Sequence, residues 1–354
     1  MKSILVTGGS GFIGSHICTL LLEKGYEVTI FDSFINSGPK VFEKIIDLGL
    51  RKNKQNLNKL KLIKGDLRDL KSLNILFDNN FSKQESFDGV IHLAGLKSTL
   101  KSIEDPLSYW DSNLSGTINL IKVMQKNFCN KIIFSSSATI YDLNENLPIT
   151  EENSLNPINP YGNTKFAIEK FLKDLYNSSS LNWKIASLRY FNPIGAHPSG
   201  ELGEDPKDVP NNIFPLIIKV AQRKIDKFEI YGDDWPTNDG TAIRDYIHIE
   251  DLSKAHIKAY EYIKDSKNNY EFFNIGTGIG YSVIEVINTF EKISGKKLNY
   301  MFADRRKGDI EKIYADTKKA NEKMKWKAKF DLKKMLESAW SWELKRNSNK
   351  KTLI

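Results

Sequence analysis

The feature that most constrains this sequence is a glycine-rich turn close to the N-terminus, where residues 7–14 read TGGSGFIG. The apolar run Ile4–Thr7 before it predicts a strand, and the apolar spacing after Gly11 predicts a helix that runs to Lys24 and ends at Gly25. Glycines spaced in this way permit a tight strand-to-helix turn and let the backbone approach a pyrophosphate. The pattern favours a dinucleotide-binding unit.

A carboxylate follows the second predicted strand, Val28–Phe31. Asp32 stands at the spacing where a carboxylate receives the ribose hydroxyls of a dinucleotide. Its charge would repel an adenosine 2′-phosphate, and Ser33 and Phe34 offer no cation to hold one. We therefore expect NAD rather than NADP. The alternative interpretation is a purely structural glycine turn followed by an unrelated aspartate.

Apolar, β-branched runs alternate with helical spacing through the first half of the chain. These runs are Ile4–Thr7, Val28–Phe31, Val90–Leu93, Ile132–Ser135 and Ile185–Leu188. The alternation predicts an α/β fold with a Rossmann-type doubly wound parallel sheet. After residue 190, prolines separate shorter elements, which predicts a smaller C-terminal α/β lobe. We expect an NAD-binding domain over 1–190 and a substrate lobe over 191–354, with elements that can interleave.

Composition excludes several other classes of protein. The chain has 354 residues and a net charge of +8, and residues 296–354 carry 18 Lys and Arg against 8 Asp and Glu. These charges alternate with apolar residues, as on the solvated face of a folded lobe, so no nucleic-acid partner is expected. Two separated cysteines and the lack of a long apolar run predict a cytoplasmic protein without a disulfide scaffold, clustered metal site or membrane span.

A second motif lies beyond the predicted fifth strand, which ends in Ser135, Ser136 and Ser137. Tyr161 and Lys165 follow Pro160 and are four residues apart, so they share one face of a predicted helix. A tyrosine that acts as a base near pH 7 needs its pKa lowered by about 3 units, or roughly 4 kcal/mol. A neighbouring lysine and a positive nicotinamide ring could supply that stabilisation. An accidental spacing remains the alternative.

With these motifs the chain resembles the extended short-chain dehydrogenase/reductase family, and within it the sugar-nucleotide 4-epimerases. The resemblance extends over nearly the whole length. It is carried by TGGSGFIGSH, GDLRD, IHLAGLKS, SNLSGT, FSSSATIY, PYGNTK, LRYFNPIGAHPSGELGED, PNNIFP, YGDDWPTNDGTAIRDYIH and RRKGDI. The long blocks in the second half are far more specific than the glycine turn.

The resemblance implies a homodimeric isomerase with tightly held NAD that interconverts UDP-glucose and UDP-galactose. Tyr161 would remove the proton of the sugar 4-hydroxyl while hydride leaves carbon 4. The 4-keto sugar would then turn over and regain hydride on its other face. Lys165 would bind the nicotinamide ribose and lower the pKa of Tyr161, and Ser137 would assist the proton transfer. The helices expected over 106–128 and 160–176 would form the dimer contact.

The resemblance also implies sets of contact residues. The cofactor contacts would be Gly8, Gly11, Phe12, Ile13, Gly14, Asp32, Asp66, Leu67, Leu93, Lys97, Asn113, Ser135, Lys165 and Tyr190. The substrate contacts would be Ser137, Tyr161, Asn192, Asn212, Tyr231, Arg244, Arg306 and Ile313. Arginines can make bidentate hydrogen bonds to the diphosphate, and an aromatic ring can stack against uracil. Arg305 is an alternative to Arg306.

Departures from the family pattern leave alternatives open. Asp142 replaces a usual glycine, without an expected effect on the chemistry. Dehydratases of the family carry Asp-Glu after the catalytic Ser or Thr, whereas this chain has Ala138 and Thr139, which disfavours dehydration. Ile313 is of intermediate bulk where a large aromatic would exclude N-acetylated sugars, so UDP-N-acetylglucosamine is a second candidate substrate. A uronate substrate and a non-catalytic NAD-binding regulator are further alternatives.

Overall fold

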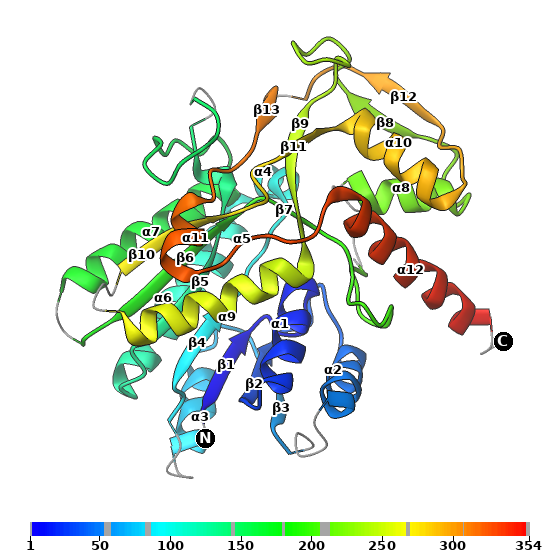
Figure 1. Cartoon of the computed structure of the whole chain (residues 1–354). Coiled ribbons are helices and arrows are strands. Elements are labelled where there is room, and N and C mark those ends of the chain that lie inside the picture. The colour runs from blue at the N-terminus through cyan, green and yellow to red at the C-terminus, as the bar shows by residue number, and fades with distance from the viewer. Residues whose placement is uncertain are drawn as a thin grey trace.

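The computed structural model describes residues 2–52, 58–81, 86–142, 146–178, 181–205, 213–266, 270–306 and 308–351. Its centre is a sheet of seven parallel strands in the order β10-β6-β5-β4-β1-β2-β3 (Figure 1). The strands are β1 (Ser3–Thr7), β2 (Glu27–Asp32), β3 (Leu60–Lys64), β4 (Gly89–His92), β5 (Lys131–Ser137), β6 (Lys184–Tyr190) and β10 (Tyr270–Ile275). The predicted Rossmann-type fold is confirmed.

Helices cover both faces of this sheet, and each face has its own apolar core. One face packs against α1 (Phe12–Glu23), α2 (Lys40–Lys52) and α9 (Ile249–Asp265). The other packs against α3 (Leu70–Phe81), α6 (Gly116–Lys126) and α7 (Pro160–Asn177). Strands buried on both faces explain the continuous apolar runs of the sequence.

The single helix expected over 106–128 is interrupted. The chain forms α4 (Thr99–Glu104) and α5 (Pro106–Tyr109), then a π-helical turn, η2 (Trp110–Ser115), before α6 begins. Such turns accommodate an extra residue in a helix and often lie at functional sites. Here the turn carries Asn113, one of the expected cofactor contacts.

The second lobe has two small sheets. Strands β7 (Asn192–Ile194), β9 (Ile243–His248), β11 (Gly280–Ser282) and β13 (Lys312–Ile313) form one, and β8 (Phe228–Tyr231) pairs with β12 (Tyr300–Ala303). Helices α8 (Ile213–Ala221), α10 (Val283–Ser294), α11 (Lys318–Met324) and α12 (Leu332–Lys351) complete the chain. Phe214, Phe290 and Trp340 join α8, α10 and α12 in a third core.

The two lobes share the C-terminal half of the sequence. Strand β9 belongs to the second lobe, but α9, which follows it, packs against the large sheet and β10 becomes that sheet's edge strand. The division into domains over 1–190 and 191–354 stays a prediction. In the structure α9 and β10, which come from the second of these ranges, pack with the large sheet. In the described part of the chain, no helix is long and apolar enough to cross a membrane.

Candidate active site

The glycine turn lies where β1 leads into α1. Gly8 adopts a φ of +71°, and its amide donates to the Phe31 carbonyl at 2.9 Å. A Cβ on Gly14 would lie 2.3 Å from the Gly8 oxygen, so only glycine lets α1 pack this closely on the turn. The predicted tight strand-to-helix turn is present.

Asp32 is tied to this turn. Its buried carboxylate accepts hydrogen bonds from the Ser10 amide (2.9 Å), the Phe34 amide (2.9 Å) and the Ser37 hydroxyl (2.8 Å). A carboxylate has about four acceptor sites, so one remains for a ligand hydroxyl. The Ser10 hydroxyl is buried and has no hydrogen-bond partner within the described residues. A close backbone turn, an unused hydroxyl and a carboxylate at the strand end fit the phosphates and ribose of NAD.

Several other expected cofactor contacts already have protein partners. The Asp66 carboxylate pairs with Arg68 at 2.7 Å, and this hydrogen bond lowers the pKa of Asp66. The exposed Lys97 ammonium lies 3.4 Å from a Glu204 carboxylate oxygen of the second lobe. These groups would rearrange or share their partners when a dinucleotide binds.

Other expected cofactor contacts lie near the C-terminal ends of the same parallel strands or in the apolar cores that flank the sheet. The hydroxyls of Ser135 and Tyr190 hydrogen-bond each other. Phe12 and Ile13 begin α1, Leu93 follows β4 with its amide bonded to the Thr7 carbonyl at 3.1 Å, and Leu67 is buried. Parallel strands place these C-terminal ends together, where ligands of open α/β sheets bind.

Buried His92, at the end of β4, joins β1 to the first turn of α6. His92 Nδ1 lies 2.7 Å from the Thr7 hydroxyl, and Nε2 lies 2.8 Å from the Thr117 hydroxyl. Burial lowers the pKa of His92 to about 3, so the ring is neutral at physiological pH. The Thr117 hydroxyl donates to the Asn113 carbonyl, and we therefore place the imidazole proton on Nε2.

Asn113 continues this chain to the catalytic helix. Its Oδ1 accepts from the Leu96 amide at 2.8 Å, and its Nδ2 donates to the Thr164 hydroxyl at 3.0 Å. The Thr164 hydroxyl in turn donates to the Tyr161 carbonyl at 2.8 Å. Asn113 thus links the loop after β4 to the first turn of α7. The bonds that His92, Thr117 and Thr164 make could not be read from local motifs.

Tyr161 and Ser137 meet as expected. Helix α7 starts at Pro160, and the Asn159 side chain caps it by accepting from the Gly162 amide at 2.9 Å. Burial of the Tyr161 hydroxyl raises its pKa to about 12, although a hydrogen bond with Ser137 works in the opposite direction. The Ser137 hydroxyl also accepts from the Thr139 amide and the Thr139 hydroxyl, at 3.2 and 3.0 Å.

Lys165 is buried one turn further along α7. Its ammonium donates to the Ser135 carbonyl at 2.8 Å and lies 5.8 Å from the centre of the Tyr161 ring. Burial lowers the pKa of Lys165 to about 8, against the effect of the Glu169 carboxylate. In the chain alone, burial dominates the pKa of Tyr161. The lowering of this pKa by Lys165, which the resemblance implies, stays a prediction for the loaded site.

The expected diphosphate contacts lie on the second lobe. Arg244 on β9 is half-buried, and its guanidinium donates to the Ile243 and Ile310 carbonyls, both at 2.9 Å. No carboxylate of the described residues lies within ion-pairing distance of Arg244, so this arginine has capacity for an anion. Burial lowers the pKa of Arg244, while Asp309 raises it and Arg306 lowers it further, which places Arg306 near Arg244.

The two candidate arginines before β13 have different neighbours. Arg306 lies over the Tyr231 ring at 4.4 Å and pairs with Asp309 at 3.0 Å, whereas Arg305 lies over the Trp235 ring at 3.9 Å and pairs with Asp234. Because Arg306 is near both Tyr231 and Arg244, we favour it as the phosphate contact. Asn212 lies outside the described residues.

Ile313 and Asn192 are both half-buried on strands that pair with β9. Asn192 on β7 pairs with Tyr246, and Ile313 on β13 pairs with Arg244. Ile313 packs against an apolar cluster that includes Ala138, the residue after Ser137. Ile313, the expected specificity position, therefore packs against a cluster that includes residues following the end of β5.

The parallel sheet, the glycine turn with Asp32, and the Ser137–Tyr161–Lys165 group define a dinucleotide-dependent enzyme of the short-chain dehydrogenase/reductase class. The chain belongs to the family described as GDP-mannose 4,6 dehydratase, whose profile matches residues 5–339, within the extended short-chain dehydrogenases/reductases. This confirms the predicted family membership.

Individual relatives share nearly the whole length. UDP-glucose 4-epimerase of Bacillus subtilis is 43% identical over 341 residues, which cover 96% of this chain and 96% of that protein. A crystal structure of UDP-glucose-4-epimerase from Stenotrophomonas maltophila with bound NAD and formylated UDP-arabinopyranose matches with a TM-score of 0.91. It is 38% identical and covers 99% of this chain and 100% of that one. The UDP-Glc/GlcNAc 4-epimerase of Campylobacter jejuni matches with a TM-score of 0.81 and 33% identity, covering 98% and 100%.

Proposed function

We propose that this protein is an NAD-dependent isomerase that interconverts UDP-glucose and UDP-galactose by inverting sugar carbon 4. The observation that carries the proposal is that Ser137, at the end of β5, lies near Tyr161, one helical turn from a buried Lys165 whose ammonium is bonded to the Ser135 carbonyl. These groups lie at the same C-terminal ends of the parallel strands as the glycine turn. Arg244 of the second lobe, which pairs with no carboxylate of the described residues, would bind the diphosphate. The relatives of this length that carry the epimerase name support the same reaction.

In this mechanism Tyr161 takes the proton of the sugar 4-hydroxyl, with Ser137 bonded to the reacting oxygens. NAD, held by the glycine turn and Asp32, would supply the hydride acceptor and then the hydride donor for carbon 4. The 4-keto sugar turns over while Arg244 and Arg306 hold its diphosphate, and Tyr161 gives the proton back on the other face. Tyr161 starts with a pKa near 12 in the chain alone. The cations around the phenol in the loaded site must therefore bring that pKa down.

Proton NMR tests the proposed function most directly. Purified protein is incubated with UDP-galactose without added NAD, and UDP-glucose is expected as product because the cofactor is retained. If nothing converts even after NAD is added, the 4-epimerase assignment fails. Appearance of a 4-keto-6-deoxy product would instead indicate a dehydratase, which the Ala138–Thr139 pair disfavours.

The choice between plain and N-acetylated sugars depends on Ile313. We propose that the intermediate bulk of Ile313, which packs against the apolar cluster containing Ala138, leaves room for UDP-N-acetylglucosamine as a second substrate. Replacing Ile313 with tyrosine should lower kcat/KM for UDP-N-acetylgalactosamine about tenfold or more while changing that for UDP-galactose less than about threefold. Both rates are measured by NMR for the Ile313→Tyr and Ile313→Val variants. Equal losses for the two sugars would remove Ile313 as the position that discriminates them.

We also propose that the protein is a cytoplasmic homodimer. Apolar side chains stand exposed on α4, α5 and η2, with Ile103 60% and Leu107 78% exposed and Leu100 and Trp110 beside them. Such a cluster is typical of a protein–protein interface. Light scattering should give twice the chain mass of 40.5 kDa, and a Leu107→Asp variant should give the single chain mass. A wild-type monomer at micromolar concentration would contradict the dimer.

A further inference from the structure

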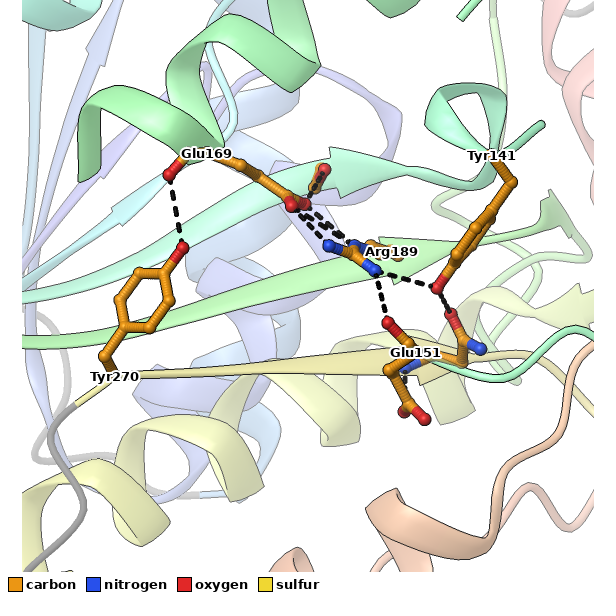
Figure 2. Close-up of polar contacts among 7 residues, drawn as sticks. Tyr141, Glu151, Glu169, Arg189 and Tyr270 are labelled. Carbon is orange, nitrogen blue, oxygen red and sulfur yellow. Dashed lines mark hydrogen bonds and ion pairs between the residues drawn. The ribbon is translucent and has the colours of Figure 1, made fainter. Parts of the chain in front are cut away.

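A buried ion pair joins the catalytic helix to the neighbouring strand. Glu169 on α7 and Arg189 on β6 are only 4% and 2% exposed. Arg189 Nε lies 3.1 Å from Glu169 Oε1, and Nη2 lies 2.6 Å from Oε2, so the contact is bidentate. Figure 2 shows the two side chains facing each other between the helix and the strand. Neither residue belonged to any predicted contact set.

The polar groups around the pair are well supplied with partners. Glu169 Oε1 also accepts from the Ser136 hydroxyl at 2.6 Å. Arg189 Nη1 donates to the Tyr141 hydroxyl at 3.1 Å and the Glu151 carbonyl at 3.2 Å. The Tyr141 hydroxyl in turn donates a hydrogen bond to Asn274 Oδ1 at 2.6 Å (Figure 2). The guanidinium is thus held in one orientation.

Stability alone is a weak reason for such a pair. Removing two charges from water is costly, and buried ion pairs can often be replaced by apolar residues without loss of stability. Burial opposes the charge on Arg189, but the Glu169 carboxylate outweighs it and raises the pKa of Arg189 above its ordinary range.

Glu169 follows Lys165 by four residues on the same face of α7. Residues at this spacing are neighbours on a helix surface, so the carboxylate lies one turn beyond the ammonium. The other groups that face Lys165 are uncharged or already bonded: neutral His92 on β4, the Ser135 carbonyl and Phe134 ring on β5, and the Tyr161 phenol on α7. On β6, the Tyr190 phenol bonds Ser135 and the Arg189 guanidinium bonds Glu169.

We propose that Glu169, fixed in place by Arg189, is a positioning residue that keeps the Lys165 ammonium charged inside the protein. The negative charge of Glu169 offsets the loss of water around Lys165. A charged Lys165 is what a phenolate at Tyr161 requires. Arg189 holds the carboxylate at a fixed distance and joins α7 to β6, so the charge cannot swing away. This inference rests on the proposed epimerase reaction.

The direction of the effect follows from the signs of the charges. Burial lowers the pKa of Lys165 to about 8, and Glu169 is the group that raises it. Without that carboxylate the pKa of Lys165 falls further, so the lysine becomes neutral at a lower pH. Activity that needs the ammonium is present below the lysine pKa and is lost as pH rises through it. The basic limb of the kcat profile should therefore move to lower pH.

The primary variant is Glu169→Gln, which keeps the shape and removes the charge. We expect the basic limb of kcat for UDP-galactose to move down by about one pH unit, with KM changed less than about threefold. At pH 8 kcat would fall about fivefold, because roughly a tenth rather than half of the lysine would be protonated. Ser136→Ala is the matched control, since it removes a hydrogen bond to the same carboxylate but no charge. Its basic limb should stay in place.

A second measurement does not depend on activity. Trace labelling of lysine amines with acetic anhydride across pH, followed by peptide mass spectrometry, gives the pKa of Lys165 in the protein as isolated, with its retained cofactor. That pKa should be lower in Glu169→Gln than in wild type and unchanged in Ser136→Ala. If wild type fails to convert UDP-galactose, the proposed function fails, whereas the labelling result still decides the role of Glu169.

The variant could be unstable because it leaves Arg189 buried without a countercharge. The double variant Glu169→Gln/Arg189→Gln removes both charges and so leaves no buried ion without a countercharge. Because the Arg189 cation opposes the lysine charge, its removal gives back part of the shift. The double variant should therefore shift the labelling and kinetic profiles in the same direction as the single variant, but by less. A folded single or double variant with an unchanged lysine pKa and basic limb would overturn the proposal and leave the pair a purely structural contact.

Discussion

Replacing Tyr161 with phenylalanine should lower kcat for UDP-galactose by about a thousandfold or more, because the variant has no group to take the proton of the 4-hydroxyl. The ring remains in place, so the packing of α7 should be preserved. Retained NAD per chain and the affinity for UDP should match wild type. The measurement is single-turnover and steady-state NMR kinetics with the amount of bound cofactor determined separately.

The matched control for this variant is Tyr260→Phe. Tyr260 is a buried tyrosine on α9 that packs against Tyr26 and lies beside Gly89, where β4 begins. It is therefore at the end of the parallel sheet opposite Ser137 and Tyr161. Its hydroxyl should be dispensable, and kcat should stay within about twofold of wild type. Wild-type turnover in Tyr161→Phe would show that another group is the base. A loss of cofactor from that variant would instead assign Tyr161 to binding.

Replacing Gly14 with alanine should abolish the retention of NAD. The new methyl group would lie 2.3 Å from the Gly8 oxygen and 2.7 Å from the Gly9 Cα, and both are backbone atoms. Helix α1 would have to move away from β1, which opens the turn that approaches the phosphates. The isolated variant should hold less than about a tenth of the NAD found in wild type, as measured by cofactor release after denaturation, and should melt at a lower temperature.

Gly38→Ala is the control for this substitution. A Cβ at Gly38 meets no atom within 4 Å, although the residue follows Ser37, a partner of Asp32. The control should keep wild-type cofactor content and stability. Full NAD occupancy in Gly14→Ala would mean that the turn is not the cradle for the phosphates.

The sequence allowed the fold and the nucleotide end to be predicted because their signals are local. The turn with Gly8 and Gly14 needs glycine at fixed spacing, Asp32 closes the next strand, and Tyr161 and Lys165 are one helical turn apart. Within each of these motifs the residues are separated by about 25 positions or fewer, so the motif can be recognised in the sequence. The structure has the tight turn at Gly8 and Gly14 and places Asp32 beside it. The roles of these residues toward NAD stay predictions.

Other parts of the site depend on partners far apart in the sequence. Glu169 meets Arg189 across a helix and a strand, and His92 meets Thr117 within the interior. Single polar residues in apolar runs carry no signal of such partners. The position of the Lys165 ammonium on the Ser135 carbonyl likewise depends on how α7 packs on β5. The π-helical turn at Asn113 was missed because its sequence has ordinary helical spacing.

The return of β10 to the large sheet has a consequence for how the chain reaches its final form during synthesis. Strand β10 covers the edge of β6, yet it is made only after much of the second lobe has left the ribosome. Until then β6 presents an open row of backbone donors and acceptors, which invites pairing with other chains. The nucleotide-binding part therefore cannot finish folding first as an independent unit, and a fragment ending after β6 would expose an aggregation-prone edge.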